Sequence, residues 1–323
     1  MLTRRGAGVA LLACCAGVPT ARAQSFPDQP IRLIVPFAAG GPADTVARLI
    51  GRVMAQRLGQ PVVVESRSGA GGVVGVEAVA HSRPDGHTIV LASTGAMVAL
   101  PHMMPRMPYD HLRDLAPISL VIRVPHLLAV GPKVPARTLP ELLALARKQP
   151  GQLTFGSAGN GSTPHLAGEL FRQRAGLDLV HVPYRGAAPA VTDLLAGQVD
   201  IILADLPVLL PHVRGGTVKA LAVAAPERSA TLPEVPTMAE AGLSGVESDT
   251  WYGLLAPAGT APDRIGVLQQ SLVAALNDAE TRRALLEQGG NPVGGTAEEF
   301  AAFLRQETTK WGEVIRAAHI RME

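Results

Sequence analysis

Aromatic side chains are the scarcest large residues in this 323-residue chain, at only 3% of the composition. Single-stranded nucleic acids are usually bound on stacked aromatic rings, so this class of partner is not expected. Charged residues are also few, at 17%, and the formal net charge is only +2. Because nucleic-acid-binding proteins normally carry a basic surface, we expect no nucleic-acid partner.

Cysteine is nearly absent, and both cysteines, Cys14 and Cys15, lie within the first 23 residues. This segment has a basic start, a short apolar run and the small-residue site Ala21-Arg22-Ala23, which predict a signal peptide cleaved before Gln24. The exported chain would then lack thiols, which excludes disulfides, thiolate catalysis and cysteine metal sites. We therefore expect a periplasmic protein.

Long hydrophobic runs are missing after the predicted signal peptide. A membrane-spanning helix needs about 18–20 apolar residues in succession, so we expect the exported chain to be soluble. Two alternatives for export stay open. Leu12-Ala13-Cys14 resembles a lipoprotein cleavage site, and the Arg4-Arg5 pair occurs in twin-arginine signals.

Short apolar runs alternate with helical patterns twice along the chain, which favours two α/β units with parallel sheets covered by helices. The first unit has strand candidates at 31–35, 61–65 and 88–92 and helix candidates at 44–58 and 74–80. The second has strand candidates at 153–155, 180–182, 199–203 and 218–223 and helix candidates at 138–147, 163–175 and 189–196. A last strand candidate at 250–256 precedes helix candidates at 262–276, 279–288 and 297–318.

Chain crossings near 118–130 and 251–256 would join the two units. We therefore expect a signal peptide at 1–23, a first lobe of residues 24–123 plus 250–323, and a second lobe of residues 124–249. A ligand is expected between the lobes, at the carboxyl ends of the strands.

Two similar loops, residues 36–44 and 156–165, follow a strand candidate and precede a helix candidate. Both are rich in small residues, which let backbone N–H groups approach a ligand closely. The helix start that follows adds unpaired N–H groups and a partial positive charge. Each loop thus predicts an anion site without Lys or Arg, although glycine is also common in ordinary strand-to-helix turns.

Other chemistries find weaker support in the sequence. The glycines of residues 69–75 depart from the spacing of a dinucleotide-binding loop and indicate a turn into a helix, so no cofactor is expected. The segment 102–107, with one histidine and three methionines, could bind a soft metal or form an apolar surface loop, and we expect no metal. No G-x-S-x-G motif is present, and His165 is expected to wall the pocket or cap a helix rather than catalyse.

Two further residues have open roles. Asp205 ends a strand candidate, where it would accept hydrogen bonds from a ligand amine or hydroxyl, or cap a turn at Pro207. Arg185 follows another strand candidate and is interpreted mainly as a solvated loop residue.

Several motifs together resemble the Bug family, the periplasmic receptors of tripartite tricarboxylate transporters. The resemblance runs in order from about residue 26 to residue 320. The motifs are Pro36-Phe37-x-x-Gly40-Gly41-x-x-Asp44-x-x-Ala47-Arg48, Gly69-Ala70-Gly71-Gly72, Pro84-Asp85-Gly86-His87-Thr88, Gly156-Ser157-Ala158-Gly159-Asn160-Gly161-Ser162-Thr163-Pro164-His165-Leu166, Val182-Pro183-Tyr184-Arg185-Gly186 and Trp251-Tyr252-Gly253-Leu254-Leu255-Ala256-Pro257.

This resemblance implies an α/β, two-lobed periplasmic-binding-protein type II fold, with a mostly parallel sheet flanked by helices in each lobe. It also implies a small carboxylate held between the two loops. The ligand-binding candidates are Phe37, Ala39, Gly40, Asp44, Ser93, Ser157, Gly159, Asn160, Ser162, Thr163, His165 and Asp205.

The implied function is that of a solute receptor, not an enzyme and expected to be a monomer, which delivers its ligand to the permease of a tripartite tricarboxylate-type transporter. Two alternatives stay open. One is an exported hydrolase that uses Ser157 or Ser162 with His165, and the other is a receptor that signals through a sensor partner.

Overall fold

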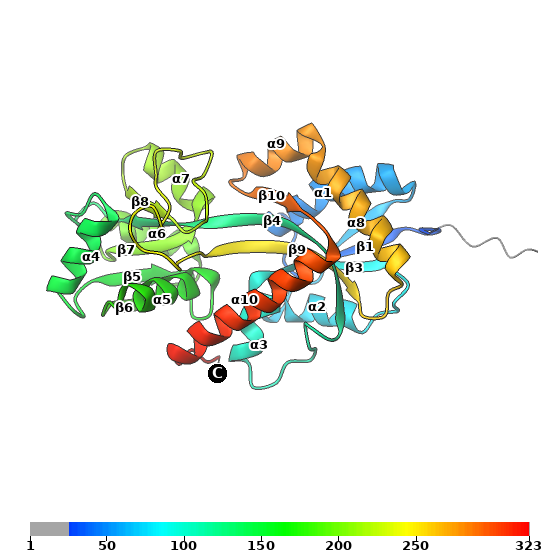
Figure 1. Cartoon of the computed structure of the whole chain (residues 1–323), viewed down its shortest axis with the longest axis horizontal. Helices are drawn as coiled ribbons and strands as arrows, with labels where there is room; N and C mark the ends of the chain where they lie inside the picture. The colour runs from blue at the N-terminus through cyan, green and yellow to red at the C-terminus, as the bar shows by residue number, and fades with distance from the viewer. Residues whose placement is uncertain (1–25, 323) are drawn as a thin grey trace, which may run out of the picture.

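The computed structural model describes residues 26–322, so the predicted signal peptide lies outside the described residues. Two α/β lobes lie at either end of a pair of long strands, β4 (Leu115–Val130) and β9 (Asp249–Pro257). Figure 1 shows these two strands crossing the middle of the molecule, with the green second lobe on the left.

The first lobe combines the beginning of the chain with its end. Its elements besides the crossing strands are β1 (Ile31–Val35), α1 (Pro42–Leu58), β2 (Val62–Ser66), α2 (Val73–Ala80), β3 (Thr88–Ser93), α3 (Leu100–Met103), α8 (Pro262–Asn277), α9 (Ala279–Glu287), β10 (Asn291–Gly294) and α10 (Ala297–Ala317). Alternate residues of β1 and β3 pack on the two faces of the sheet, where one core includes α1 and α8 and the other includes α2 and α10.

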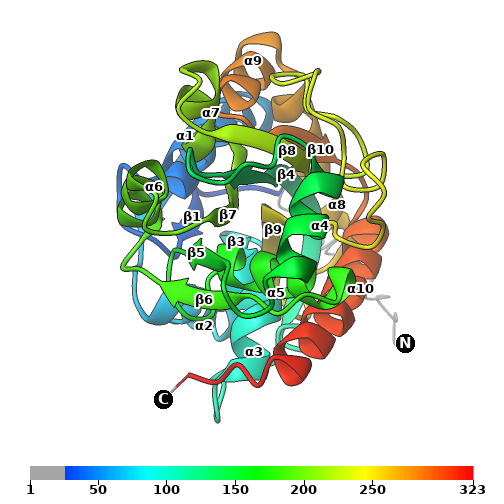
Figure 2. The same cartoon turned by 90° about the vertical axis from the view of Figure 1, so that its left-hand side faces the viewer.

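The second lobe is formed by the middle of the chain. Its elements are α4 (Leu139–Lys148), β5 (Thr154–Ser157), α5 (Thr163–Ala175), β6 (Val180–Pro183), α6 (Ala187–Ala196), β7 (Ile201–Asp205), α7 (Leu206–Arg214) and β8 (Lys219–Val223). Helices α4 and α5 belong to one core, while α6 and α7 pack in another. Figure 2 looks onto this lobe from its outer end.

The sheets are mixed, which corrects the expectation of a mostly parallel sheet in each lobe. The outer strands do pair in parallel, with the order β2-β1-β3 in the first lobe and β7-β5-β6 in the second. The crossing strands reverse this pattern, because β4 runs antiparallel to β7, β8, β9 and β10, and β9 runs antiparallel to β3. The two-lobed α/β architecture is otherwise the expected one.

Local signals in the sequence explain most helix starts. Thr138 accepts a hydrogen bond from the backbone of Glu141 at the start of α4. Thr296 and Glu299 form a reciprocal capping box at the start of α10. The glycine-rich segment 69–72 contains a short 3-10 turn, Ala70–Gly72, that leads into α2, as expected.

Helix α7 was not expected, because Pro207 and Pro211 are usually helix breakers. Pro207 lies in the first turn, where a missing N–H costs nothing. The sequence also did not predict three short elements, namely the π-helical turn Gly95–Ala99, helix α3 and strand β10. Each is too short to show a repeating pattern of hydrophobic residues.

The predicted lobe boundaries fall where the crossing strands pair, through Val124 with Thr250 and Pro125 with Asp249. The exact division into lobes stays a prediction. One hydrophobic core runs across it, since it includes Phe171 of α5 as well as Trp311 of α10. None of the helices within residues 26–322 is long and apolar enough to pass through a bilayer.

Candidate ligand-binding cleft

The first loop, residues 36–44, connects β1 to α1 and is held by Asp44. This buried carboxylate accepts hydrogen bonds from the Gly40 backbone N–H at 3.0 Å and from Arg48 Nε at 2.8 Å. The Arg48 hydrogen bond, followed by the one from Gly40, lowers the pKa of Asp44 below its usual range. Among the described residues, no side chain caps the start of α1, whose N-cap is Gly41, so the first N–H groups of this helix stay available to an anion.

The second loop, residues 156–165, connects β5 to α5 and is braced by its own side chains. Ser162 caps α5 by accepting a hydrogen bond from the His165 N–H, and its hydroxyl donates to the carbonyl of Gly159 at 2.7 Å. Ser157 is fully buried and contacts His181 Nε2 at 2.7 Å. This loop therefore satisfies most of its polar groups internally.

His165 and His181 stabilise the second loop from below. Their rings stack 3.9 Å apart, and His165 Nδ1 accepts a hydrogen bond from the Gly161 N–H. Burial lowers the pKa of His165 to about 3 and that of His181 to about 4. Both imidazoles are therefore neutral near neutral pH and add no positive charge to the loop.

Two cavities of about 400 and 420 Å³ lie between the lobes and share part of their walls. The first lies against the second loop, and the second lies against Gly40 and the start of α1. Their shared wall consists of Asp205, Val208, Thr250 and Tyr252. We call the two cavities together the cleft.

The cleft has little charge. Among residues 26–322, Asp205 is the only charged side chain that lines either cavity, and neither is lined by Lys or Arg. Burial, reinforced by the Asp205 carboxylate, raises the pKa of Tyr252, which therefore stays a neutral hydroxyl. An anion in the cleft would accept hydrogen bonds from N–H groups and hydroxyls and would be stabilised by the helix starts, without forming a salt bridge.

Seven of the twelve predicted ligand-binding residues line the cleft. They are Phe37, Gly40, Ser93, Asn160, Ser162, Thr163 and Asp205. The other five, Ala39, Asp44, Ser157, Gly159 and His165, line neither cavity. Asp44, Ser157 and His165 direct their polar atoms into the loops, which they hold in shape.

The family is decided by the comparison with known proteins. Residues 46–320 match the model of the "Tripartite tricarboxylate transporter family receptor". The chain belongs to this family. It is 38% identical over 324 residues to Protein BugT of Bordetella pertussis, covering 100% of this chain and 99% of the relative.

Solved structures agree with this assignment. The receptor resembles Rhodopseudomonas palustris Rpa4515, solved with adipate, at 33% identity and a TM-score of 0.77, covering 92% of this chain and 99% of that one. It also resembles MatC from the same organism, solved with bound malate, at 34% identity and a TM-score of 0.73, covering 90% and 100% of the two chains. The receptor thus has the periplasmic-binding-protein fold, and its family consists of solute-binding receptors rather than enzymes.

The local geometry also disfavours the hydrolase alternative. Ser162 and His165 make the contacts of a helix cap, and Ser157 is buried against His181 rather than His165. With a pKa of about 4, His181 is a weak base at neutral pH. In the segment 102–107, His102 Nε2 contacts the Thr308 carbonyl, and no cluster of three His, Cys, Asp or Glu that could hold a metal occurs within the described part of the chain.

Sequence reasoning missed the contribution of the crossing strand β9. Thr250 and Tyr252 line both cavities, while Trp251 between them is fully buried on the other face. Successive side chains of a strand point to opposite faces of the sheet, so this alternation could have been predicted from the strand candidate at 250–256. The Thr250 hydroxyl lies 2.8 Å from the Thr163 hydroxyl, so β9 directly supports the second loop.

Proposed function

We propose that this receptor binds a small carboxylate in the cleft and delivers it to the permease of a tripartite tricarboxylate-type transporter. The observation that carries the proposal is the pair of helix starts, α1 and α5, bordering a cleft that no Lys or Arg of residues 26–322 lines. Such a site suits a carboxylate, because N–H groups and hydroxyls make charge-assisted hydrogen bonds to it. The adipate and malate of the related structures are small carboxylates too.

The two loops are proposed to have different tasks in binding. The second loop presents the Asn160 and Thr163 side chains to the cleft, while the Ser162 hydroxyl, which also lines it, donates to the Gly159 carbonyl and braces the loop. The first loop contributes the open N–H groups at the start of α1. We expect the carboxylate to be bound fully only when closure of the lobes brings both sets of donors to the same ligand.

Asp205 is proposed to recognise the rest of the ligand. A carboxylate accepts hydrogen bonds, so it fits a hydroxyl or amine of the ligand rather than a second carboxylate. Its side chain does not cap α7, although it occupies the N-cap position.

Export is proposed to place the receptor in the periplasm, where its family acts. The signal peptide that the sequence predicts at residues 1–23 would direct it there, and the permease would be its partner in the membrane.

Native mass spectrometry of protein purified from its host tests the proposal. We expect a retained small carboxylate in the wild-type protein. Ala158→Phe would fill the cleft from the second loop and should abolish retention, whereas Ala188→Phe, on the exposed surface of α6, should not. A retained compound without a carboxyl group, or one that persists in Ala158→Phe, would contradict the proposal.

A further inference from the structure

A carboxylate in this cleft faces an unbalanced charge. The lining already carries one negative charge, on Asp205, and no Lys, Arg or His residue among residues 26–322 lines either cavity. Asp205 would repel a ligand carboxylate placed beside it, and the low dielectric of a closed cleft would strengthen this repulsion. Either the ligand brings a cation, or the protein gains a proton.

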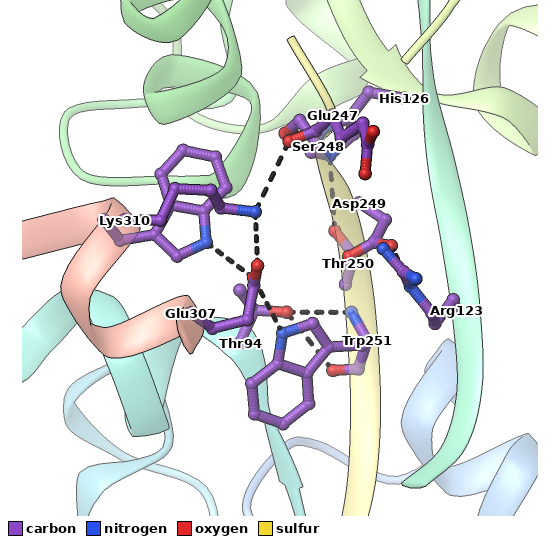
Figure 3. A network of polar contacts seen from close by, with 11 residues as sticks. Thr94, Arg123, His126, Glu247, Ser248, Asp249, Thr250, Trp251, Glu307 and Lys310 are labelled. Atoms are coloured by element: carbon purple, nitrogen blue, oxygen red, sulfur yellow. Dashed lines mark hydrogen bonds and ion pairs between the residues drawn. The ribbon is translucent and has the colours of Figure 1, made fainter. Parts of the chain in front are cut away.

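His126 lies behind Asp205 and is fully buried on the crossing strand β4. Its Nδ1 is 2.7 Å from the Ser248 hydroxyl, and its Nε2 is 3.2 Å from Asp205 Oδ1 and 3.4 Å from Thr250 Oγ1. Figure 3 shows His126 and Ser248 together where the two crossing strands meet. His126 thus contacts two residues that line the cleft without lining it itself.

Asp205 has an oxygen atom that suits a proton at this point. Its Oδ1 is buried and has no hydrogen-bond partner within the described residues, although His126 Nε2 is close. About 31% of the Asp205 side chain is exposed, so the remainder of the group faces the cleft. The Nε2–H tautomer of neutral His126 already serves the buried Oδ1. One further proton would make His126 an imidazolium that donates from Nε2 to Oδ1 and from Nδ1 to the Ser248 hydroxyl, and this proton would neutralise the negative charge on the wall of the cleft.

We propose that the His126–Asp205 pair determines which charge a ligand can carry into the cleft. A carboxylate without a cationic group binds together with one proton, which the solvent supplies and the pair holds. A zwitterionic ligand, whose ammonium group lies beside Asp205, binds without this proton. The inference rests on the proposed function and extends it to the charge class of the ligand.

The other ionisable groups near the pair do not supply this proton. Tyr252 on β9 is neutral, as described above. Arg123 and Asp249 form an ion pair on the opposite face of the crossing strands, where burial raises the pKa of Asp249. Glu247, next to Ser248, is exposed, and its carbonyl accepts a hydrogen bond from Lys310 (Figure 3).

Malate and aspartate make a matched pair of probes, because an ammonium group replaces the hydroxyl on the same dicarboxylate skeleton. Their dissociation constants are measured by titration of thermal stability at pH 6.0 and pH 8.0. Uptake of one proton changes affinity by at most about tenfold per pH unit. For wild-type protein we expect malate to bind at least about tenfold more tightly at pH 6.0, and aspartate to change less than about threefold.

Two variants locate the proton. Asp205→Asn should bind malate with equal affinity at both pH values and more tightly than wild type at pH 8.0, while its affinity for aspartate should fall. Malate itself ionises in the same way with wild type and with Asp205→Asn, so its own ionisation cancels when the pH dependence of the two proteins is compared. His126→Gln should also lose the pH dependence, and His212→Gln, on α7 and away from both cavities, should keep it.

Equal malate affinity at both pH values in wild type, or a pH dependence that survives Asp205→Asn, would overturn the inference. If His126→Gln does not fold, Asp205→Asn alone decides. If neither probe binds, the inference fails, because a neutral cleft should admit malate at pH 6.0. The proposed function would still stand if the compound retained in native mass spectrometry is another carboxylate.

Discussion

The two loops of the cleft look alike in sequence but are stabilised in different ways. Each joins a strand to a helix, contains a glycine at positive φ and has proline in the first turn of its helix. The first loop depends on one carboxylate, Asp44, and leaves the start of α1 without a side-chain cap. The second has its own cap, Ser162, and a stack of the buried His165 on the partly buried His181.

This difference bears on how a two-lobed receptor binds. A braced loop keeps its hydroxyls in position before the ligand arrives, which reduces the entropy lost on binding. An uncapped helix start keeps N–H donors free for the ligand but orders them less. We infer that the second loop provides the first contact and that the first loop completes it.

Replacing the glycine that packs beneath each loop with alanine should have the largest effect on the stability of the protein. A Cβ on Gly75 of α2 would lie 2.7 Å from the Pro36 Cα, and one on Gly168 of α5 would lie 2.3 Å from the Phe155 ring. Such overpacking costs about 1–3 kcal/mol, and we place Gly75→Ala at the upper end because backbone atoms cannot rotate away. Urea denaturation would measure both losses.

The same pair also separates the two loops in binding. Gly75→Ala displaces the start of the first loop and should weaken ligand affinity as well as stability. Gly168→Ala acts on a ring below the second loop, whose internal hydrogen bonds should preserve its shape. A greater loss of affinity in Gly168→Ala than in Gly75→Ala would show that the bracing does not protect the second loop.

Thr163→Ala should weaken binding of the retained ligand by about 10- to 100-fold, since a charge-assisted hydrogen bond contributes about 1.5–3 kcal/mol. The free energy of unfolding should fall by only about 1 kcal/mol, from the lost hydrogen bond to Thr250, because Ser162 rather than Thr163 caps α5. Calorimetry and thermal melting of the same variant check both expectations. Unchanged affinity would remove the Thr163 hydroxyl from the binding site.

Asp44→Asn should destabilise the first loop by about 1 kcal/mol at neutral pH, since the amide replaces a charged acceptor of two hydrogen bonds. The pKa of Asp44 is lowered in the folded protein, so its contribution is present above the unfolded value of about 3.9 and is lost as the pH falls through the folded value. Wild type should therefore lose more stability than Asp44→Asn between pH 5 and pH 3. Parallel losses in denaturation experiments would refute this role.

Arg185→Ala should have the smallest effect, within about twofold in affinity, because exposed charges contribute little. Arg185 is exposed and lines neither cavity of the cleft. Calorimetry beside Thr163→Ala makes the comparison direct. If Arg185→Ala abolishes binding while Thr163→Ala does not, the carboxylate is held by a salt bridge and the two-loop interpretation fails.

Much of the cleft was predictable from the sequence, because its two loops are local features. Small residues between an apolar run and a helix start point to free N–H groups whatever the rest of the chain does. Asp205 was predictable for the same reason, since a residue that ends a buried strand emerges at the edge of the sheet. The roles of Asp44 and Ser157 were not, because their partners depend on how each loop folds back on itself.

The sequence by itself determined most of the alternating strands and helices, the family, and two loops without Lys or Arg. These follow from local hydrophobic periodicity, helix capping and short motifs. Only the tertiary structure decided that β4 and β9 reverse the direction of the sheets, that Thr250 supports Thr163, and that His126 lies against Asp205. His126 and Asp205 are 79 positions apart and are joined by the pairing of β4 with β7, while Thr163 and Thr250 are 87 positions apart and meet where the second loop packs against β9.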